Sequence, residues 1–211
     1  MWFIGDVHGQ YHRYESFCLD LSESIQVGDM GVGFPDIGDT LSPAPIYKHN
    51  HKFICGNHDD YKHAIQYPNC LGRFGYIEEH DIFYISGGFS IDKQWREPNV
   101  TWWDYEELSG QEQLDCIELY EETKPSIVCS HECPTVAKYW ALFYSRGSGK
   151  KGITSPTETT LNVLWSINQP KYWIHGHFHQ FYTKQEGNTL FVGLDELMDG
   201  KKENCIYEIN T

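Results

Sequence analysis

Residues 1–9 read Met1-Trp2-Phe3-Ile4-Gly5-Asp6-Val7-His8-Gly9, an apolar run followed by a carboxylate and an imidazole two positions apart. The run has the length of a buried strand, and side chains two apart in an extended chain lie on the same side. The flanking glycines permit a sharp turn after the strand. Asp6 and His8 are therefore candidate ligands of one metal ion, although an ordinary strand-end turn gives the same pattern.

Polar side chains follow four further predicted strands in the same way. These strands cover residues 24–27, 51–55, 126–130 and 171–175, and the polar residues that follow them are Gly28-Asp29, Gly56-Asn57-His58-Asp59, His131 and Gly176-His177-Phe178-His179. Because the carboxyl ends of strands in an open α/β sheet line one crevice, we expect all of these side chains to lie near one another.

Capping signals predict helices between the strands. Residues 14–21 carry apolar side chains at helical spacing, and Ser109-Gly110-Gln111-Glu112 has the form of a capping box, which predicts a helix with Leu114, Ile117 and Tyr120 facing inward. Ser155-Pro156-Thr157-Glu158 predicts the start of another helix. Further strands are expected at 81–85, 88–91, 189–193 and 205–209, and loops at 34–50 and in the glycine-rich, basic residues 145–152.

Composition and charge limit the classes of function. The 211 residues, of which 40% are hydrophobic and 15% aromatic, predict one ordered domain spanning 1–211. No apolar run is long enough for a membrane span, and the seven cysteines form no C-x-x-C pair, so we expect a cytoplasmic protein with reduced thiols. A net charge of −14 argues against binding to bulk nucleic acid.

The five strand-end motifs, taken in order, resemble those of the calcineurin-like metallophosphoesterases. The resemblance covers residues 5–179 and implies an α/β fold, a β-sandwich of two mixed sheets flanked by helices, with a metal site at the carboxyl ends of the strands. It implies two divalent metal ions, Mn being expected first and Fe, Zn or Ni next. One ion would be held by Asp6, His8, Asp29 and His179, and the other by Asp29, Asn57, His131 and His177.

The resemblance also implies a phosphate-ester substrate and a mechanism. A hydroxide bridging the two metals would attack phosphorus, His58 would assist the leaving group, and Asp59 would orient the His58 ring. Two divalent ions, two aspartates and one hydroxide leave about one net positive charge, which would attract an anionic ester into an otherwise acidic protein.

The chain departs from one branch of that family. Phosphoprotein phosphatases extend the second motif to Gly-Asp-x-Val-Asp-Arg-Gly, whereas this chain has Gly28-Asp29-Met30-Gly31-Val32-Gly33 and lacks both the second aspartate and the arginine. Contacts to phosphate must therefore come from elsewhere. Lys93, Arg96 and Arg146 are candidates, with solvated surface charge as the alternative.

Several functions remain open at this point. A phosphomonoesterase and a phosphodiesterase acting on cyclic nucleotides or nucleic-acid ends both fit the motifs, and a serine/threonine protein phosphatase is a further alternative. Outside the enzymes, the same residues would suit a metal-dependent binding module without turnover.

Overall fold

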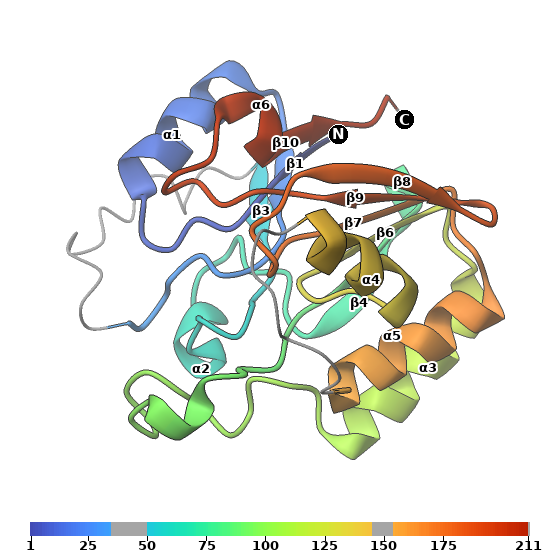
Figure 1. The fold of residues 1–211 in the computed structure, drawn as a ribbon, viewed down its shortest axis with the longest axis horizontal. Coiled ribbons are helices and arrows are strands. Elements are labelled where there is room, and N and C mark those ends of the chain that lie inside the picture. Colours follow the sequence, from blue (N-terminus) through green and yellow to red (C-terminus); the bar gives the residue numbers. More distant parts are fainter. Residues whose placement is uncertain (35–49, 145–153, 211) are drawn as a thin grey trace.

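Two mixed β-sheets stack face to face in the computed structural model, which describes residues 1–34, 50–144 and 154–210 (Figure 1). The first sheet has the order β10 (Ile206–Glu208), β1 (Trp2–Ile4), β2 (Ser24–Gln26), β3 (His51–Phe53). The second has the order β4 (Phe74–Ile77), β5 (Ile82–Ile85), β6 (Ile127–Ser130), β7 (Tyr172–His175), β9 (Thr189–Gly193), β8 (Tyr182–Glu186). The inner strands of each sheet are parallel, and β10, β4 and β8 are antiparallel strands at the edges.

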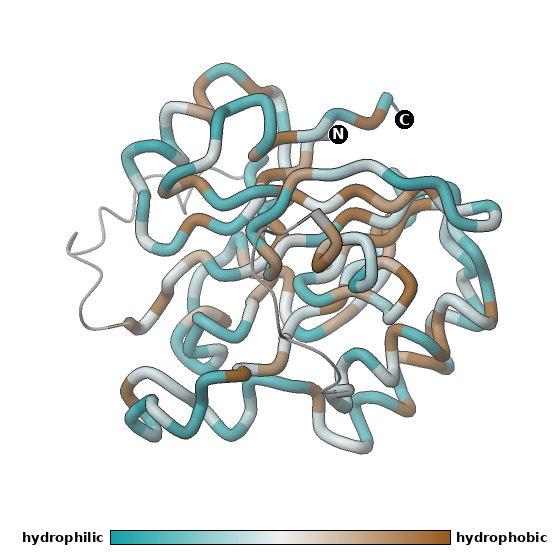
Figure 2. The backbone as a smooth tube through the Cα atoms, in the orientation of Figure 1, coloured by the Kyte–Doolittle hydropathy of each residue, from teal (hydrophilic) through white to brown (hydrophobic). Residues whose placement is uncertain are grey.

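Successive residues of the inner strands face two different cores. Ile82 and Ile174 join the apolar cluster between the sheets, together with Phe3 of β1. Their neighbours Phe83 and Trp173 point to the opposite side, into the cluster under the helices. This period of two follows from the pleat of the strands, and the hydrophobic residues along the strands are visible in Figure 2. Both faces of the second sheet are therefore buried, as parallel sheets require.

Helices cover the outer faces of the sandwich. The helices are α1 (Tyr11–Asp20), α2 (Tyr61–Ala64), α3 (Gly110–Thr123), α4 (Thr135–Tyr144), α5 (Pro156–Ile167) and α6 (Lys202–Cys205), with two short 3₁₀ turns at Glu78–His80 and Lys93–Trp95. Helices α1 and α2 bury residues in the cluster next to the first sheet, whereas α3, α4 and α5 bury residues against the second. The predicted α/β sandwich of two mixed sheets flanked by helices is thus confirmed.

The predicted helix starts are confirmed at Ser109 and Ser155. The Ser109 side chain accepts from the Glu112 amide while the Glu112 carboxylate accepts from the Ser109 amide, and the Ser155 hydroxyl accepts from the Glu158 amide. The predicted inward face of α3 was wrong at Leu114, which is 62% exposed. Tyr120 is buried as predicted, Ile117 is partly buried, and the helix also buries Cys116. Leu114 lies about 200° around the helix from Cys116.

Three strand assignments differ from the prediction. Residues 88–91 form a loop rather than the predicted strand. The edge strands β4 and β8 were not predicted, because their sequences carry no clear apolar alternation. Loops were predicted at 34–50 and 145–152, and of these residues 35–49 and 145–152 lie outside the described residues. None of the helices in the described ranges combines the length and the apolar character needed to cross a bilayer.

Candidate metal centre

The seven residues proposed as ligands meet at one end of the sandwich. They lie just beyond the carboxyl ends of β1, β2 and β3 in the first sheet and of β6 and β7 in the second. Because these strands are parallel within each sheet, their loops open in one direction and place residues far apart in sequence side by side.

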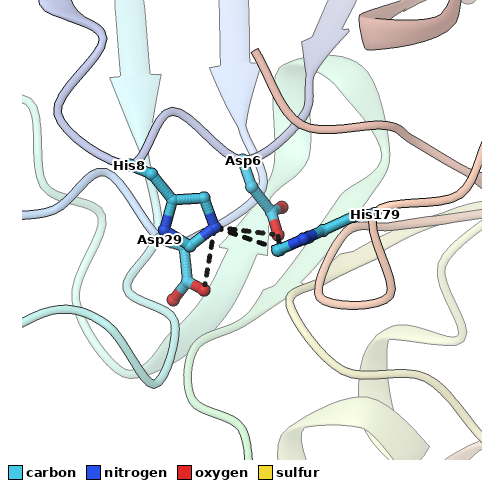
Figure 3. A group of neighbouring side chains, drawn as sticks. All are labelled: Asp6, His8, Asp29 and His179. Atoms are coloured by element: carbon cyan, nitrogen blue, oxygen red, sulfur yellow. Dashed lines mark hydrogen bonds and ion pairs between the residues drawn. The ribbon is translucent and has the colours of Figure 1, made fainter. Parts of the chain in front are cut away.

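The first cluster consists of Asp6, His8, Asp29 and His179. One ligand atom from each of these side chains lies within 4.8 Å of the others. His8 Nε2 is 3.0 Å from His179 Nε2 and 3.7 Å from Asp29 Oδ2, and His179 Nε2 is 3.2 Å from Asp6 Oδ2. In Figure 3, dashed lines join the His8 ring to the other three side chains.

The second cluster consists of Asp29, Asn57, His131 and His177. The Asn57 Oδ1 atom is 3.0 Å from His131 Nε2 and 2.9 Å from His177 Nδ1, and these two nitrogens are 3.2 Å apart. His131 Nε2 is also 3.3 Å from Asp29 Oδ1. The four donor atoms thus converge on one small volume inside the protein.

Asp29 belongs to both clusters through different oxygens. Its Oδ2 faces His8 in the first cluster, whereas its Oδ1 faces His131 in the second and accepts a 2.7 Å hydrogen bond from the His58 amide. A carboxylate in this position can bind one ion with each oxygen.

The backbone at the centre adopts uncommon conformations. Asp29 and three of the clustered histidines, His8, His177 and His179, have φ values between 45° and 67°. Residues other than glycine rarely adopt this left-handed region, and such positions gather at functional sites. The loops therefore hold these side chains inward against the ordinary preference of the backbone.

Nearby glycines leave the space that the ligands occupy. A Cβ atom on Gly56 would lie 2.1 Å from Asp29 Oδ1 and 2.6 Å from His131 Nε2. A Cβ atom on Gly176 would lie 1.9 Å from Asp6 Oδ1. The Gly-Asn and Gly-His motifs therefore need glycine at Gly56 and Gly176, because a side chain there would clash with the candidate ligands.

The donor set fits a pair of divalent cations. Donors bound at about 2.1 Å around one ion lie about 3.0–3.4 Å apart, the range seen within the second cluster. His131 Nδ1 is 3.0 Å from the Val27 carbonyl, to which it donates, so Nε2 is the nitrogen that faces the oxygens of Asn57 and Asp29 and would bind a cation in place of its proton. The buried Asp6 Oδ1, in addition, has no hydrogen-bond partner within the described residues.

The electrostatics of the site favour positive charge. Burial acts to raise the pKa of Asp29, but His131, His58 and His8 outweigh it and hold that pKa well below its usual range. Burial likewise acts to lower the pKa of His131, but the charge and hydrogen bond of Asp29 raise it to about 10. At His179 burial again acts to lower the pKa, but Asp6 raises it to about 9, whereas burial and the neighbouring His131 hold the pKa of His177 well below its usual range. The carboxylates thus attract protons to His131 and His179, and a divalent cation would use the same attraction.

His58 and Arg96 lie together beside the first cluster. The Nη2 atom of Arg96 is 2.5 Å from His58 Nε2, and Asp92 holds the same guanidinium nitrogen at 2.8 Å. The His58 ring stacks on Phe34, with ring centroids 5.2 Å apart, and meets the His8 ring edge-on. Burial lowers the pKa of His58 to about 4, so the ring is neutral at pH 7 and accepts from Arg96.

The other two predicted substrate contacts are placed differently. The Nζ atom of Lys93 lies over the Phe89 ring, 4.8 Å from its centroid, and 5.8 Å from the centroid of the Trp102 ring. Arg146 lies outside the described residues. Of the two candidates within the described residues, Arg96 is therefore the one that contacts a candidate site residue.

Asp59 is placed differently from its predicted role in orienting the His58 ring. Its carboxylate accepts hydrogen bonds from the backbone amides of Met30, Gly31, Val32 and Gly56, at 2.7–3.1 Å. These four bonds use the acceptor capacity of both oxygens. Asp59 thus ties the loop after β2 to the loop after β3, and it acts on Asp29 and Asn57 through the backbone.

Sequence reasoning missed the residues that contact the ligands from outside. Ser90 Oγ accepts a hydrogen bond from the Asn57 amide, and Glu196 Oε2 is 3.5 Å from His179 Nδ1. One signal was available: Gly87-Gly88 precedes Ser90, and a Cβ atom on Gly88 would lie 3.0 Å from His131 Cδ2. A glycine pair at the start of a predicted strand can mark such close approach.

Comparison with known proteins agrees with this geometry. The family model of the calcineurin-like phosphoesterases matches residues 1–181, which include all of the motifs. No curated protein matches the sequence. Among solved structures, phosphopantetheinyl hydrolase (PptH) from Mycobacterium tuberculosis is similar at a TM-score of 0.50 and 13% identity, covering 99% of this chain and 94% of that one.

A second solved structure has the same level of similarity. GAP50, described as the anchor in the inner membrane complex of Plasmodium, matches at a TM-score of 0.50 and 12% identity, covering 92% of this chain and 70% of that one. Identities this low show a common fold alone. The family match, which extends over most of the sequence, shows that this chain belongs to the calcineurin-like phosphoesterases.

Proposed function

We propose that this protein hydrolyses phosphate esters at a centre of two divalent ions, one held by each cluster. Membership of the phosphoesterase family supports the reaction class. The observation that carries the proposal is the position of Asp29, whose two oxygens face different clusters. Two cations about 3.5–4 Å apart need such a shared anion between them.

The ligand sets follow from the two clusters. Asp6, His8, Asp29 and His179 would hold the first ion, and Asp29, Asn57, His131 and His177 the second. Divalent ions bound there would activate a water molecule and neutralise charge on the phosphoryl oxygens. The nitrogen and oxygen donors suit Mn, which we expect to support activity best, and also Fe, Zn or Ni.

His58 and Arg96 complete the proposed site. His58 lies next to His8 and is not in either ligand set, so it is available to assist the departing oxygen. The Arg96 guanidinium, held by Asp92, stands where it can donate to a phosphoryl oxygen or to His58. We assign Asp59 a positioning role, because it fixes the loops that carry Asp29 and Asn57.

Two further features of the proposal concern substrate and compartment. Monoester and diester substrates both remain candidates, and the missing Asp-Arg extension after Asp29 makes a protein phosphatase the weaker choice. The seven cysteines are all free thiols, which supports a reducing compartment such as the cytoplasm.

Hydrolysis assays test the proposal directly. We expect the protein loaded with Mn²⁺ to hydrolyse para-nitrophenyl phosphate, its bis-ester or a cyclic nucleotide, with Ni²⁺, Zn²⁺ and Mg²⁺ compared in parallel. His58→Ala should lower turnover by roughly 10²–10⁴-fold without changing the number of bound ions. A protein that binds two ions but is inactive on the whole panel would contradict the proposal and favour a binding module. Loss of both ions in His58→Ala would contradict the role of His58.

A further inference from the structure

A line of hydrogen bonds leads away from the second cluster into the protein interior. Asn57 Nδ2 donates to Ser90 Oγ at 3.1 Å, and Ser90 Oγ donates to Glu106 Oε2 at 2.6 Å. The Ser90 amide donates to the other Glu106 oxygen at 2.9 Å. All three residues are at most 5% exposed, so water does not compete for these bonds.

The direction of each bond in this line is fixed by Glu106. An ionised carboxylate only accepts, and 2.6 Å is typical of a hydroxyl bonded to a carboxylate, so the Ser90 proton is committed to Glu106. The Ser90 oxygen can then only accept from Asn57. Asn57 must therefore turn its NH₂ group toward Ser90 and its carbonyl oxygen toward His131 and His177.

The loop that carries Ser90 is itself held in place. The Gly87 amide donates to the Cys55 carbonyl at 2.7 Å, and Gly88 packs against the His131 ring. Ser90 thus cannot move away from Asn57 without disturbing the end of β3, which carries the Gly-Asn motif. This explains why residues 88–91 form a loop although their sequence is compatible with a strand.

We propose that Glu106, acting through Ser90, is a positioning residue that fixes the orientation of the Asn57 amide and thereby the affinity of the second cluster for its ion. The inference rests on the ligand assignment of the proposed function, and it extends that assignment to two residues outside both ligand sets. Without this line, the Asn57 amide could rotate and present its NH₂ group, which cannot bind a cation.

Glu106→Gln removes the acceptor-only partner and nearly keeps the shape of the side chain. A glutamine can donate to Ser90, which frees the Ser90 proton to point at Asn57 and favours the rotated amide. We expect the affinity for the second equivalent of Mn²⁺ to fall roughly 10–100-fold, the usual effect of losing an outer partner of a ligand, while the first equivalent is unchanged. Equilibrium dialysis with elemental analysis gives both stoichiometry and affinity.

Glu107→Gln is the matched control. Glu107 is the adjacent residue and has the same side chain, but its Oε1 accepts from the Thr157 amide and hydroxyl and not from Ser90. The Glu107→Gln protein should bind both Mn²⁺ equivalents as the wild type does. Equal losses in the two variants would overturn the proposal, because the effect would then be one of charge or stability.

Reversing the polarity of the line gives a sharper test. In Asn57→Asp, position 57 has only acceptors and needs a proton from Ser90, which Glu106 withholds. Adding Glu106→Gln releases that proton. In the Asn57→Asp background, Glu106→Gln should therefore leave the affinity for the second Mn²⁺ unchanged or raise it, whereas in the wild-type background it lowers that affinity. A similar loss in both backgrounds would overturn the proposal. Since the readout is bound Mn²⁺, failure of the protein to hydrolyse any ester would be seen separately and would concern the proposed activity alone.

Discussion

The two clusters that share Asp29 differ in charge and in access to solvent. The first has two carboxylates, and its His179 side chain is 37% exposed. The second has Asp29 as its one carboxylate, together with an amide and two imidazoles, and its His131 side chain is fully buried. We therefore expect charge to dominate ion binding in the first cluster and fixed orientation to dominate it in the second. We expect the first ion to exchange readily and the second to depend on the surrounding hydrogen bonds.

Asp29→Asn removes the feature common to both clusters and should have the largest effect. Each ion loses an anionic ligand, and an amide cannot present an oxygen to both sides. We expect both Mn²⁺ equivalents to bind more weakly and hydrolysis to fall by a factor on the order of 10³ or more. Elemental analysis after dialysis measures the first effect. Retention of two tightly held ions would show that the clusters do not depend on a shared carboxylate.

Gly56→Ala should disturb the contact between the clusters by sterics alone. The added Cβ would clash with Asp29 Oδ1 and His131 Nε2. We expect loss of ion binding and a fall of about 1–3 kcal/mol in the free energy of unfolding, as for other overpacked sites. Denaturant titration measures the change in stability. Gly110→Ala is the control, since a Cβ there meets nothing within 4 Å; a comparable loss in both variants would contradict this explanation.

Paired alanine substitutions separate the clusters. His179→Ala should weaken the first ion and leave the second in place, with little effect on folding, because the side chain is partly exposed. His131→Ala should weaken the second ion and also cost about 1–3 kcal/mol of stability, since the Val27 carbonyl loses its buried donor. Mn²⁺ titration combined with thermal unfolding distinguishes the two. Identical profiles would show that the clusters act as a single unit.

The smallest effect concerns the rate at which the ions leave. With a chelator present, the wild-type protein should lose its Mn²⁺ in two phases, the faster one from the more exposed first cluster. Timed removal of protein from chelator, followed by elemental analysis, measures both rates. His179→Ala should remove the fast phase only. A single phase in the wild type would contradict the difference in access that the structure indicates.

The inner strands and the helix caps could be predicted from sequence because their signals are local. Ser109 and Ser155 each act within one turn of their own helix. The strand-end motifs could be placed together because parallel strands share an edge. By contrast, the edge strands β4 and β8 pair antiparallel with β5 and β9. Their partly polar sequences lack the apolar alternation that would have predicted a strand.

The sequence predicted which candidate ligands would lie together, but not the residues that contact them. Asp59 follows the histidine of its motif, yet its partners are backbone amides from a loop about thirty residues earlier in the chain, with a fourth at Gly56. Glu106 lies in an acidic, aromatic stretch that looks like surface, and it is nevertheless 5% exposed. These contacts depend on where loops cross in space, which spacing along the chain does not encode.

The left-handed backbone at His8, Asp29, His177 and His179 has a consequence for how this sequence can change. Glycine adopts such conformations without the strain that a side chain adds, so each position offers a substitution that favours folding while removing a candidate ligand. Selection for heat resistance alone would therefore tend to erode the centre at these four sites. Under the proposed function, aspartate and histidine are kept at these positions for ion binding, at a cost in stability.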